Sequence, residues 1–286
     1  MDEVQELQGE FVAERTGAGA GVQAGSWLLE LSLDWIVLRA SENIHHLLHE
    51  SHVTLIDEPL SRFVHAQALH DLRNLFSRLS GTMGIARAYG IRLSDDPDLV
   101  DVAFQLSDGR VLFEAVPSRG AFGECFGTVG GLVAGLGASR GQALLDNAAR
   151  RMRALTGYDR VTLICGEQRA ESSRGAFEAD LTLDTDVPAI VSDAQAETIA
   201  LYPRHADESA ADHALLCACD SDSREALSNA GVRAVMRIPF SADGISGEFR
   251  CDSRTARGPC FELHAAAELF AQLFAMRLEI DRLRSS

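Results

Sequence analysis

The chain has 286 residues, and its 26 basic side chains against 42 acidic ones give a formal net charge of −16. All 26 are arginines, since the sequence contains no lysine. This excludes a Schiff-base or pyridoxal-phosphate anchor, a Walker A lysine and the ATP-site lysine of a protein kinase. The acidity, with no arginine run longer than 150–153 and only 6% aromatic residues, also disfavours nucleic acid as a partner.

The chain is expected to be cytoplasmic and free of membrane contacts. No apolar run approaches the roughly 18 residues that suggest a membrane span. Five acidic residues among the first sixteen exclude a secretory signal peptide. The six cysteines show no zinc-ligand spacing and should be reduced in the cytosol, so no metal site is predicted from them.

The length suggests two domains, preceded by a flexible N-terminal arm at 1–25 that ends in alternating glycine and alanine. The first domain is predicted at 26–117. Apolar residues alternate with polar ones over 29–35, which predicts a half-buried strand. Helical spacing follows at 44–48 and again at 61–79.

A β-hairpin is predicted next, over 100–113. Apolar residues alternate on both sides of Asp108-Gly109, a dipeptide typical of a tight hairpin turn. A strand, helices and then antiparallel strands indicate an α+β fold with a mostly antiparallel sheet.

Eight glycines between 118 and 141 indicate a domain boundary, and we predict a Gly-rich linker at 118–139. The second domain, predicted at 140–286, should begin with a helix near 140–156. Its predicted strands lie at 161–165, 232–240 and 247–251.

The last predicted helix covers 261–284. Its apolar residues recur at alternating spacings of three and four, as in a coiled coil: Ala266, Leu269, Leu273, Met276, Ile280 and Leu283. This indicates a helix for dimerisation or signalling, although it could also pack only on its own sheet.

Several short motifs, in their order along the chain, resemble the PAS–GAF half of bacterial phytochromes. They are ASENI at 40–44, DVAF at 101–104, SDGR at 107–110, TGYDRV at 156–161 and NAGVRA at 229–234. The resemblance extends over about 26–284. It implies a PAS domain followed by a GAF domain, each a mostly antiparallel sheet flanked by helices, with a long C-terminal helix.

The resemblance also implies a biliverdin pocket in the GAF domain. That pocket would need an anchoring cysteine, arginines for the two propionates, and histidines that hydrogen-bond the ring carbonyls. It would also need a backbone carbonyl from a D-I-P turn for the pyrrole N–H groups.

This sequence departs from the family at most of these positions. Residues 1–25 contain no cysteine, and the alternative anchoring position, just before a histidine, holds Asp222-Ser223. Cys217 stands where a propionate-binding arginine is expected, and Asp220 stands where a serine is expected. Cys251-Asp252-Ser253 replaces the C-H-H motif that contains the second histidine.

The D-I-P turn has two possible matches. Asp186-Val187-Pro188 keeps the chemistry of the motif, whereas Ser192-Asp193 followed by 200–204 fits the family spacing without gaps. We prefer the second match. Only eleven residues separate Arg204 from Leu216, where the family has a longer segment that carries another propionate arginine.

We therefore predict a non-enzymatic sensory or regulatory module with no cofactor, which acts as a homodimer through 261–284 or through contacts with a downstream signalling protein or a fused output domain. One alternative is a red/far-red photoreceptor that binds biliverdin or another tetrapyrrole through an atypical cysteine. The other is a redox or small-ligand sensor with a remodelled GAF pocket. The predicted remnant pocket consists of Cys217, Cys219, Asp193, Tyr202, Arg204, Ser223 and Ser253.

Three smaller features have ordinary explanations that we prefer. His45, His49 and His52 could share a helix face and bind zinc, but a solvated face is expected. Cys217 and Cys219 could form a redox pair, but a disulfide at that spacing would be strained. A cation at Asp184 and Asp186 would lack the further ligands of a calcium loop.

Overall fold

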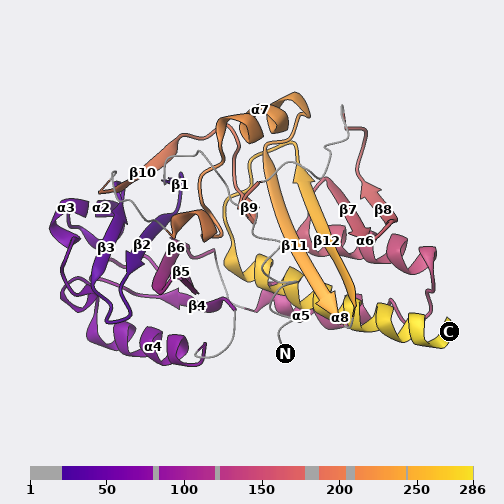
Figure 1. Ribbon diagram of the computed structural model, residues 1–286, viewed down its shortest axis with the longest axis horizontal. Helices are drawn as coiled ribbons and strands as arrows, with labels where there is room; N and C mark the ends of the chain where they lie inside the picture. The colour runs from indigo at the N-terminus through magenta and orange to yellow at the C-terminus, as the bar shows by residue number, and fades with distance from the viewer. Residues whose placement is uncertain are drawn as a thin grey trace.

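The structure, a computed structural model, describes residues 21–79, 84–119, 123–177, 187–203, 210–242 and 244–285. Two antiparallel sheets lie side by side along the long axis of the molecule, with helices around them (Figure 1). Within the described residues, no helix combines the length and apolar composition needed to cross a membrane.

The first half of the chain builds most of one sheet and its helices. Its elements are β1 (Gly21–Gln23), β2 (Trp27–Leu31), β3 (Val37–Ser41), α2 (His45–Leu48), α3 (His52–Leu55), η1 (Leu60–Arg62), α4 (Ala66–Ser77), β4 (Ala86–Ile91), β5 (Val100–Ser107) and β6 (Arg110–Pro117). The helices cover one face of this sheet. The core between them contains Trp35, Phe104 and Phe113, whose rings meet edge-on or tilted.

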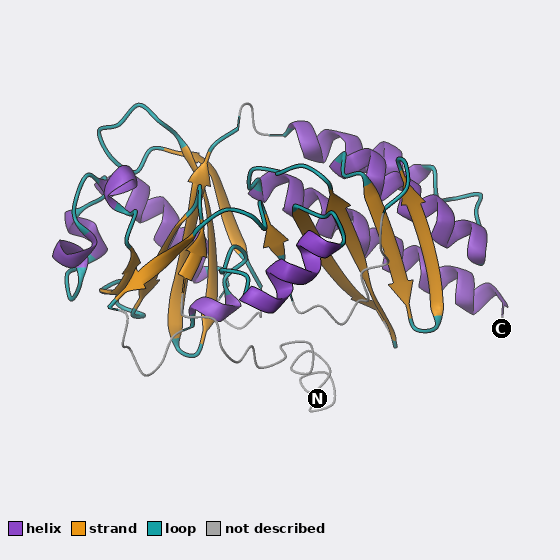
Figure 2. Cartoon of the chain, turned by 90° about the horizontal axis from the view of Figure 1, so that it is seen from above, coloured by secondary structure: helices purple, strands orange, loops and turns teal. Residues whose placement is uncertain are grey.

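The second half builds the other sheet, to which three long helices are added. Its elements are α5 (Glu124–Ala134), α6 (Gln142–Thr156), β7 (Arg160–Cys165), β8 (Gln168–Ser173), β9 (Ile190–Val191), β10 (Thr198–Tyr202), η2 (Ala211–His213), α7 (Ser221–Asn229), β11 (Ala234–Ala242), β12 (Ile245–Ser253) and α8 (Phe261–Ser285). The strand order among the described residues is β8-β7-β12-β11-β9. The long helices lie along one side of this sheet (Figure 2).

The two halves are joined because the first sheet includes a strand from the second half. The first sheet has the order β1-β10-β3-β2-β6-β5-β4 among the described residues, so β10 from the second half pairs with β3. The N-terminal strand β1 then pairs with β10 at the outer edge. The first sheet's second face is buried against 210–217 and the start of α8. The α+β fold with a long C-terminal helix is therefore confirmed.

The predicted hairpin and most later elements are confirmed, with small shifts at their ends. β5 and β6 pair along their whole length, and Asp108 and Gly109 both have a positive φ. The helices near 140–156 and 261–284 correspond to α6 and α8, and the strands at 161–165, 232–240 and 247–251 to β7, β11 and β12.

Two predicted segments differ from the structure. The strand predicted over 29–35 is interrupted, because Ser32 to Ile36 form a turn in which Trp35 has a φ of 65° and enters the core. The predicted linker contains helix α5, which packs on α8 through Val129 and its neighbours. Composition suggested a linker because the helix is rich in glycine, but burial against α8 stabilises it.

Candidate functional site

Buried ion pairs line the face of the second sheet that points away from the long helices. Asp252 accepts hydrogen bonds from Arg160 Nε at 3.0 Å and from Arg250 Nε at 3.0 Å. These three side chains are at most 3% exposed. Two cations share one carboxylate here, and Arg250 Nη2 has no partner among the described residues. Because burial of charge costs several kcal/mol per ion, the three residues depend on one another.

The neighbouring positions continue this polar surface. Arg237 donates to both carboxylate oxygens of Glu248 at 2.8–3.1 Å. The ring of Phe177 lies between two guanidinium groups, with Arg160 at 4.2 Å and Arg254 at 4.3 Å from its centroid. The sheet face is thus occupied by the protein's own charges and one aromatic ring.

Cys217, a predicted pocket residue, is buried at the junction of the two halves. It is 2% exposed and belongs to the apolar cluster that joins the two sheets. Its Sγ lies 3.4 Å from the carbonyl oxygen of Asp212. Its own carbonyl accepts from the side chain of Gln23 at 3.0 Å. A thiol so enclosed is poorly placed to attack a ligand.

Gln23 is a further buried polar residue that sequence reasoning missed. It lies on β1 and is 6% exposed. Its amide nitrogen donates to the carbonyls of Ile190 and Cys217, and its oxygen accepts from the backbone and the hydroxyl of Ser192. The side-chain amide of Gln23, with both its nitrogen and its oxygen hydrogen-bonded, therefore holds β1 against the second domain.

Two of the predicted pocket residues, Cys219 and Asp193, lie close together. Both line a cavity of about 10 Å³, together with Gln23 and Arg224. This volume holds about one water molecule and no tetrapyrrole. Burial alone would raise the pKa of Asp193, but hydrogen bonds from Arg233 and the Gln195 amide lower it below the usual value.

The other predicted residues lie apart from this cavity. Tyr202 ends β10 beside β3, with its ring 5.1 Å from that of His52. Ser223 lies in the first turn of α7 and bonds to its N-cap, Asp220. Arg204 lies outside the described residues, as do both aspartates of the possible cation site, at 184 and 186.

The C-D-S segment, 251–253, presents Asp252 and not Ser253 on the polar face. Side chains alternate along a strand, and Phe249 and Cys251 belong to the core under the helices. Ser253 therefore lies on the helix side, where its hydroxyl contacts Asp159 and Arg257. Charged residues at 248, 250 and 252, which alternate with Phe249 and Cys251, were the available signal for the polar face.

A buried carboxylate joins the two halves on the first sheet. Glu114 on β6 is 1% exposed and accepts from the backbone amides of Leu215 and Leu216 at 2.8 and 2.9 Å. Burial raises its pKa to about 7, although the two amides and Arg87 oppose this shift. Arg87 also contacts His264 and Glu268 on α8.

The predicted histidine face is not formed by one helix. His49 ends α2 with a φ of 57°, and His52 begins the separate helix α3. Among the described residues, no group of three or more histidine, cysteine or acidic side chains could hold a metal ion.

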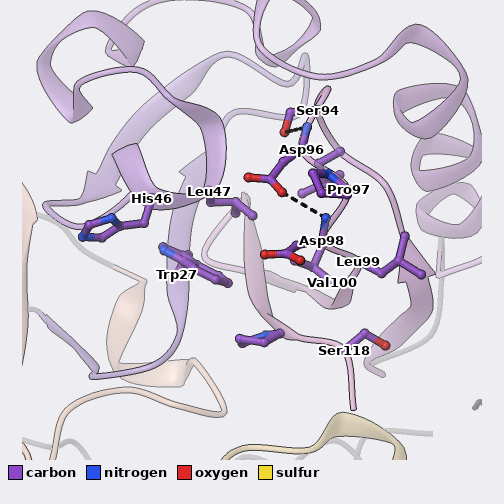
Figure 3. A pocket seen from close by; sticks show the side chains of 12 residues that line it. Trp27, His46, Leu47, Ser94, Asp96, Pro97, Asp98, Leu99, Val100 and Ser118 are labelled. Carbon is purple, nitrogen blue, oxygen red and sulfur yellow. Dashed lines mark hydrogen bonds between the residues drawn. The ribbon is translucent and has the colours of Figure 1, made fainter. Parts of the chain in front are cut away.

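A larger cleft opens at one end of the first sheet. It has a volume of about 470 Å³, within the range of small-molecule sites. Figure 3 shows Trp27 and Leu47 on one side, and Asp96 and Asp98 on the other. The indole nitrogen of Trp27 is buried without a hydrogen-bond partner among the described residues. Carboxylates facing an aromatic ring would suit a cationic ligand.

No protein-family model matches this chain, and no curated protein matches it. Solved structures do. The chromophore-binding domain of Stigmatella aurantiaca phytochrome P1 superposes with a TM-score of 0.74 at 21% identity, over 91% of this chain and 98% of that one. The chromophore-binding domain of an unusual bacteriophytochrome from R. palustris gives a TM-score of 0.71 at 22% identity, over 93% and 97%.

A longer bacteriophytochrome structure from the photosynthetic bacterium R. palustris gives a TM-score of 0.76 at 20% identity, covering 93% of this chain and 60% of that one. These identities establish the architecture, not the chemistry of the pocket. The chain thus has the PAS–GAF fold of bacteriophytochrome chromophore-binding domains, as the sequence motifs indicated.

Proposed function

We propose that this chain is a non-enzymatic sensory or regulatory module of the phytochrome type whose GAF domain does not hold biliverdin in the family's manner. The observation that carries this proposal is the buried pairing of Asp252 with Arg160 and Arg250. The resemblance puts a pocket histidine in this segment. A carboxylate held by two guanidinium groups of the protein offers no free partner to a ring carbonyl.

The position of Cys217 supports the same proposal. The resemblance expects a propionate-binding arginine there, but a thiol supplies no charge to a propionate. Its burial within the interface between the halves also keeps it from acting as an anchor. Cys219 is partly buried and is the more accessible thiol of the two.

Adding biliverdin to the purified protein and recording absorption before and after denaturation tests this proposal. A bacteriophytochrome chromophore-binding domain, assembled in parallel, is the positive control. We expect no red or far-red band that survives denaturation. Such a band would overturn the proposal and establish covalent attachment.

Cysteine variants test the alternative, a photoreceptor that attaches its tetrapyrrole through an atypical cysteine. C217S and C219S, each assembled with biliverdin, would identify the anchor by loss of the denaturation-resistant band. We expect both variants, like the parent protein, to show no band that survives denaturation. Loss in C219S alone would favour attachment through the more accessible thiol.

We further propose that the module forms a homodimer through α8. Leu269, Met276 and Leu283 recur every seven residues and are 43%, 60% and 68% exposed. Ile280 lies between them and is 45% exposed. A second copy of the same helix would cover this row with coiled-coil spacing.

Light scattering coupled to size-exclusion chromatography tests the dimer. M276E together with L283E should convert a dimer into a monomer without changing the far-UV circular dichroism, because both side chains are exposed. E268Q, on the same helix, is a control that should leave the mass unchanged. A monomeric parent protein would contradict the proposal.

A further inference from the structure

A second small cavity, of about 90 Å³, lies on the helix side of the GAF sheet, away from the ion pairs described above. Arg119, which follows β6, and Arg257, which precedes α8, both line it. The buried side chains of Thr156 and Tyr158 form another part of its wall. The cavity therefore lies between the C-terminal end of the PAS domain and the N-terminus of α8.

No carboxylate from the described residues lines this cavity. Arg257 Nε donates to the Ser253 hydroxyl and Nη2 to the carbonyl of Gly157, both neutral acceptors. Arg119 makes no hydrogen bond or ion pair with any described residue. Two guanidinium groups thus face one cavity without an opposing charge, in a protein of net charge −16.

Tyr158 adds a hydroxyl donor to the same cavity. It is 5% exposed, and its hydroxyl has no hydrogen-bond partner among the described residues. Burial raises the pKa of this phenol, so that the hydroxyl stays protonated at neutral pH and can donate.

The placement of Arg119 depends on a glycine. Its guanidinium lies so close over Gly258 that a Cβ at that position would overlap it. The backbone at Gly258 does not adopt a positive φ, so an alanine there would meet only the end of a flexible arginine. Substitution at 258 should therefore displace Arg119 without disturbing the local fold.

We propose that this cavity binds a phosphate group, either inorganic phosphate or the terminal phosphate of a small monoester. Two forked guanidinium groups match the charge and geometry of such an oxyanion, and the tyrosine supplies a further donor. The volume admits a phosphate but no larger headgroup. The bound group would bridge Arg119, after the PAS domain, and Arg257, before α8. It would thereby fix the position of the N-terminus of α8, the proposed dimerisation helix.

Isothermal titration with inorganic phosphate and with methyl phosphate, at constant ionic strength set by sodium chloride, tests this site. We expect one saturable site per chain and a rise in melting temperature with phosphate concentration. Equal affinity for both probes would indicate a monoester as the natural ligand. Preference for inorganic phosphate would indicate the free ion.

Three variants and one control make the test specific. R119Q, G258A and Y158F should each weaken binding at least tenfold while keeping the parent's circular dichroism. R78Q, which removes an exposed arginine far from the cavity in the sequence, should bind as the parent does. Absence of saturable binding by either probe, or equal weakening in R78Q, would overturn the proposal.

Discussion

The two faces of the five-stranded GAF sheet are built from the same strands but hold opposite chemistry. On the helix side, Phe249 packs against Phe270 and Phe274 with ring centroids 5.3–6.1 Å apart. On the other side, the next residues along β12, Arg250 and Asp252, are equally buried but charged. Adjacent residues of one strand therefore face an apolar core on one side of the sheet and buried charges on the other.

The two faces place different demands on the sequence. Apolar contacts under α6 and α8 tolerate many sequences of similar volume, so they preserve the PAS–GAF architecture at about one-fifth identity. Buried ion pairs need matched partners in defined positions. The proposed loss of bilin binding therefore places its sequence changes on the ionic face, where the fold itself is not determined.

The largest effect is expected from breaking the ionic face. D252A would remove the buried carboxylate that Arg160 and Arg250 share, and should lower the free energy of unfolding by about 3–5 kcal/mol. Urea denaturation measures this loss. E171A, in the half-exposed pair with Arg169, is the matched control and should change stability by less than about 1 kcal/mol.

Replacing all three charges sharpens the interpretation. A triple variant, R160M with R250M and D252L, would remove both cations together with the carboxylate they share, and should recover most of the stability that D252A loses. If the triple variant is less stable than D252A, the ion pairs contribute through packing or hydrogen bonds more than through mutual compensation.

The next effect concerns the junction of the two domains and depends on pH. Because burial raises the pKa of Glu114 to about 7, its ionisation disfavours the folded state. Stability from this residue is complete below about pH 4.5 and is lost as the pH rises to about 7, by about 3 kcal/mol. Urea denaturation of the parent protein and of E114Q, each at pH 5 and pH 8, isolates this loss as the difference between their two pH dependences.

His264 acts in the opposite direction at the same junction. Burial lowers its pKa to about 4, so its contribution is complete above about pH 6.5 and is lost as the pH falls toward 4. E114Q should therefore reveal a loss of stability on the acidic side that the parent protein masks. An unchanged pH profile in E114Q would show that the pKa of Glu114 is the same in the folded and unfolded states, and would contradict the raised pKa.

A smaller effect is expected where β1 enters the GAF domain. Q23A would leave the carbonyls of Ile190 and Cys217 and the amide of Ser192 without their side-chain partner. The free energy of unfolding should fall by about 1–3 kcal/mol. Hydrogen exchange should show faster opening of β1 than of β7, whereas uniform acceleration would contradict a local role for Gln23.

Sequence reasoning worked best where one local pattern dictates one local structure. The alternation over 100–113 and its Asp108-Gly109 turn predicted β5 and β6, because a tight hairpin requires no distant contact. The motifs of the phytochrome resemblance likewise agreed with the fold of the solved structures. It failed over 29–35, because burial of Trp35 in a turn has no local signature.

The candidate site was only partly accessible from sequence. Of the seven residues predicted for a remnant pocket, Cys219 and Asp193 line one small cavity, while Tyr202, Ser223 and Ser253 lie elsewhere. The sequence indicates Asp252 as a replacement within the C-H-H motif. It does not predict the arginine partners of Asp252, since Arg160 precedes it by 92 residues. Pairing between β7 and β12 brings these residues together, and the residue pattern along a single sequence gives no sign of that register.

By itself the sequence determined the α+β class, the hairpin, the long C-terminal helix and the exclusion of lysine-dependent chemistry, because composition and periodicity are local properties. Only the tertiary structure decided what the 26 arginines and 42 acids do. It pairs some of them inside the GAF sheet and leaves Arg119 and Arg257 facing a cavity without a carboxylate. The strength of a charge interaction depends on distance and burial, and both are set by which strands become neighbours.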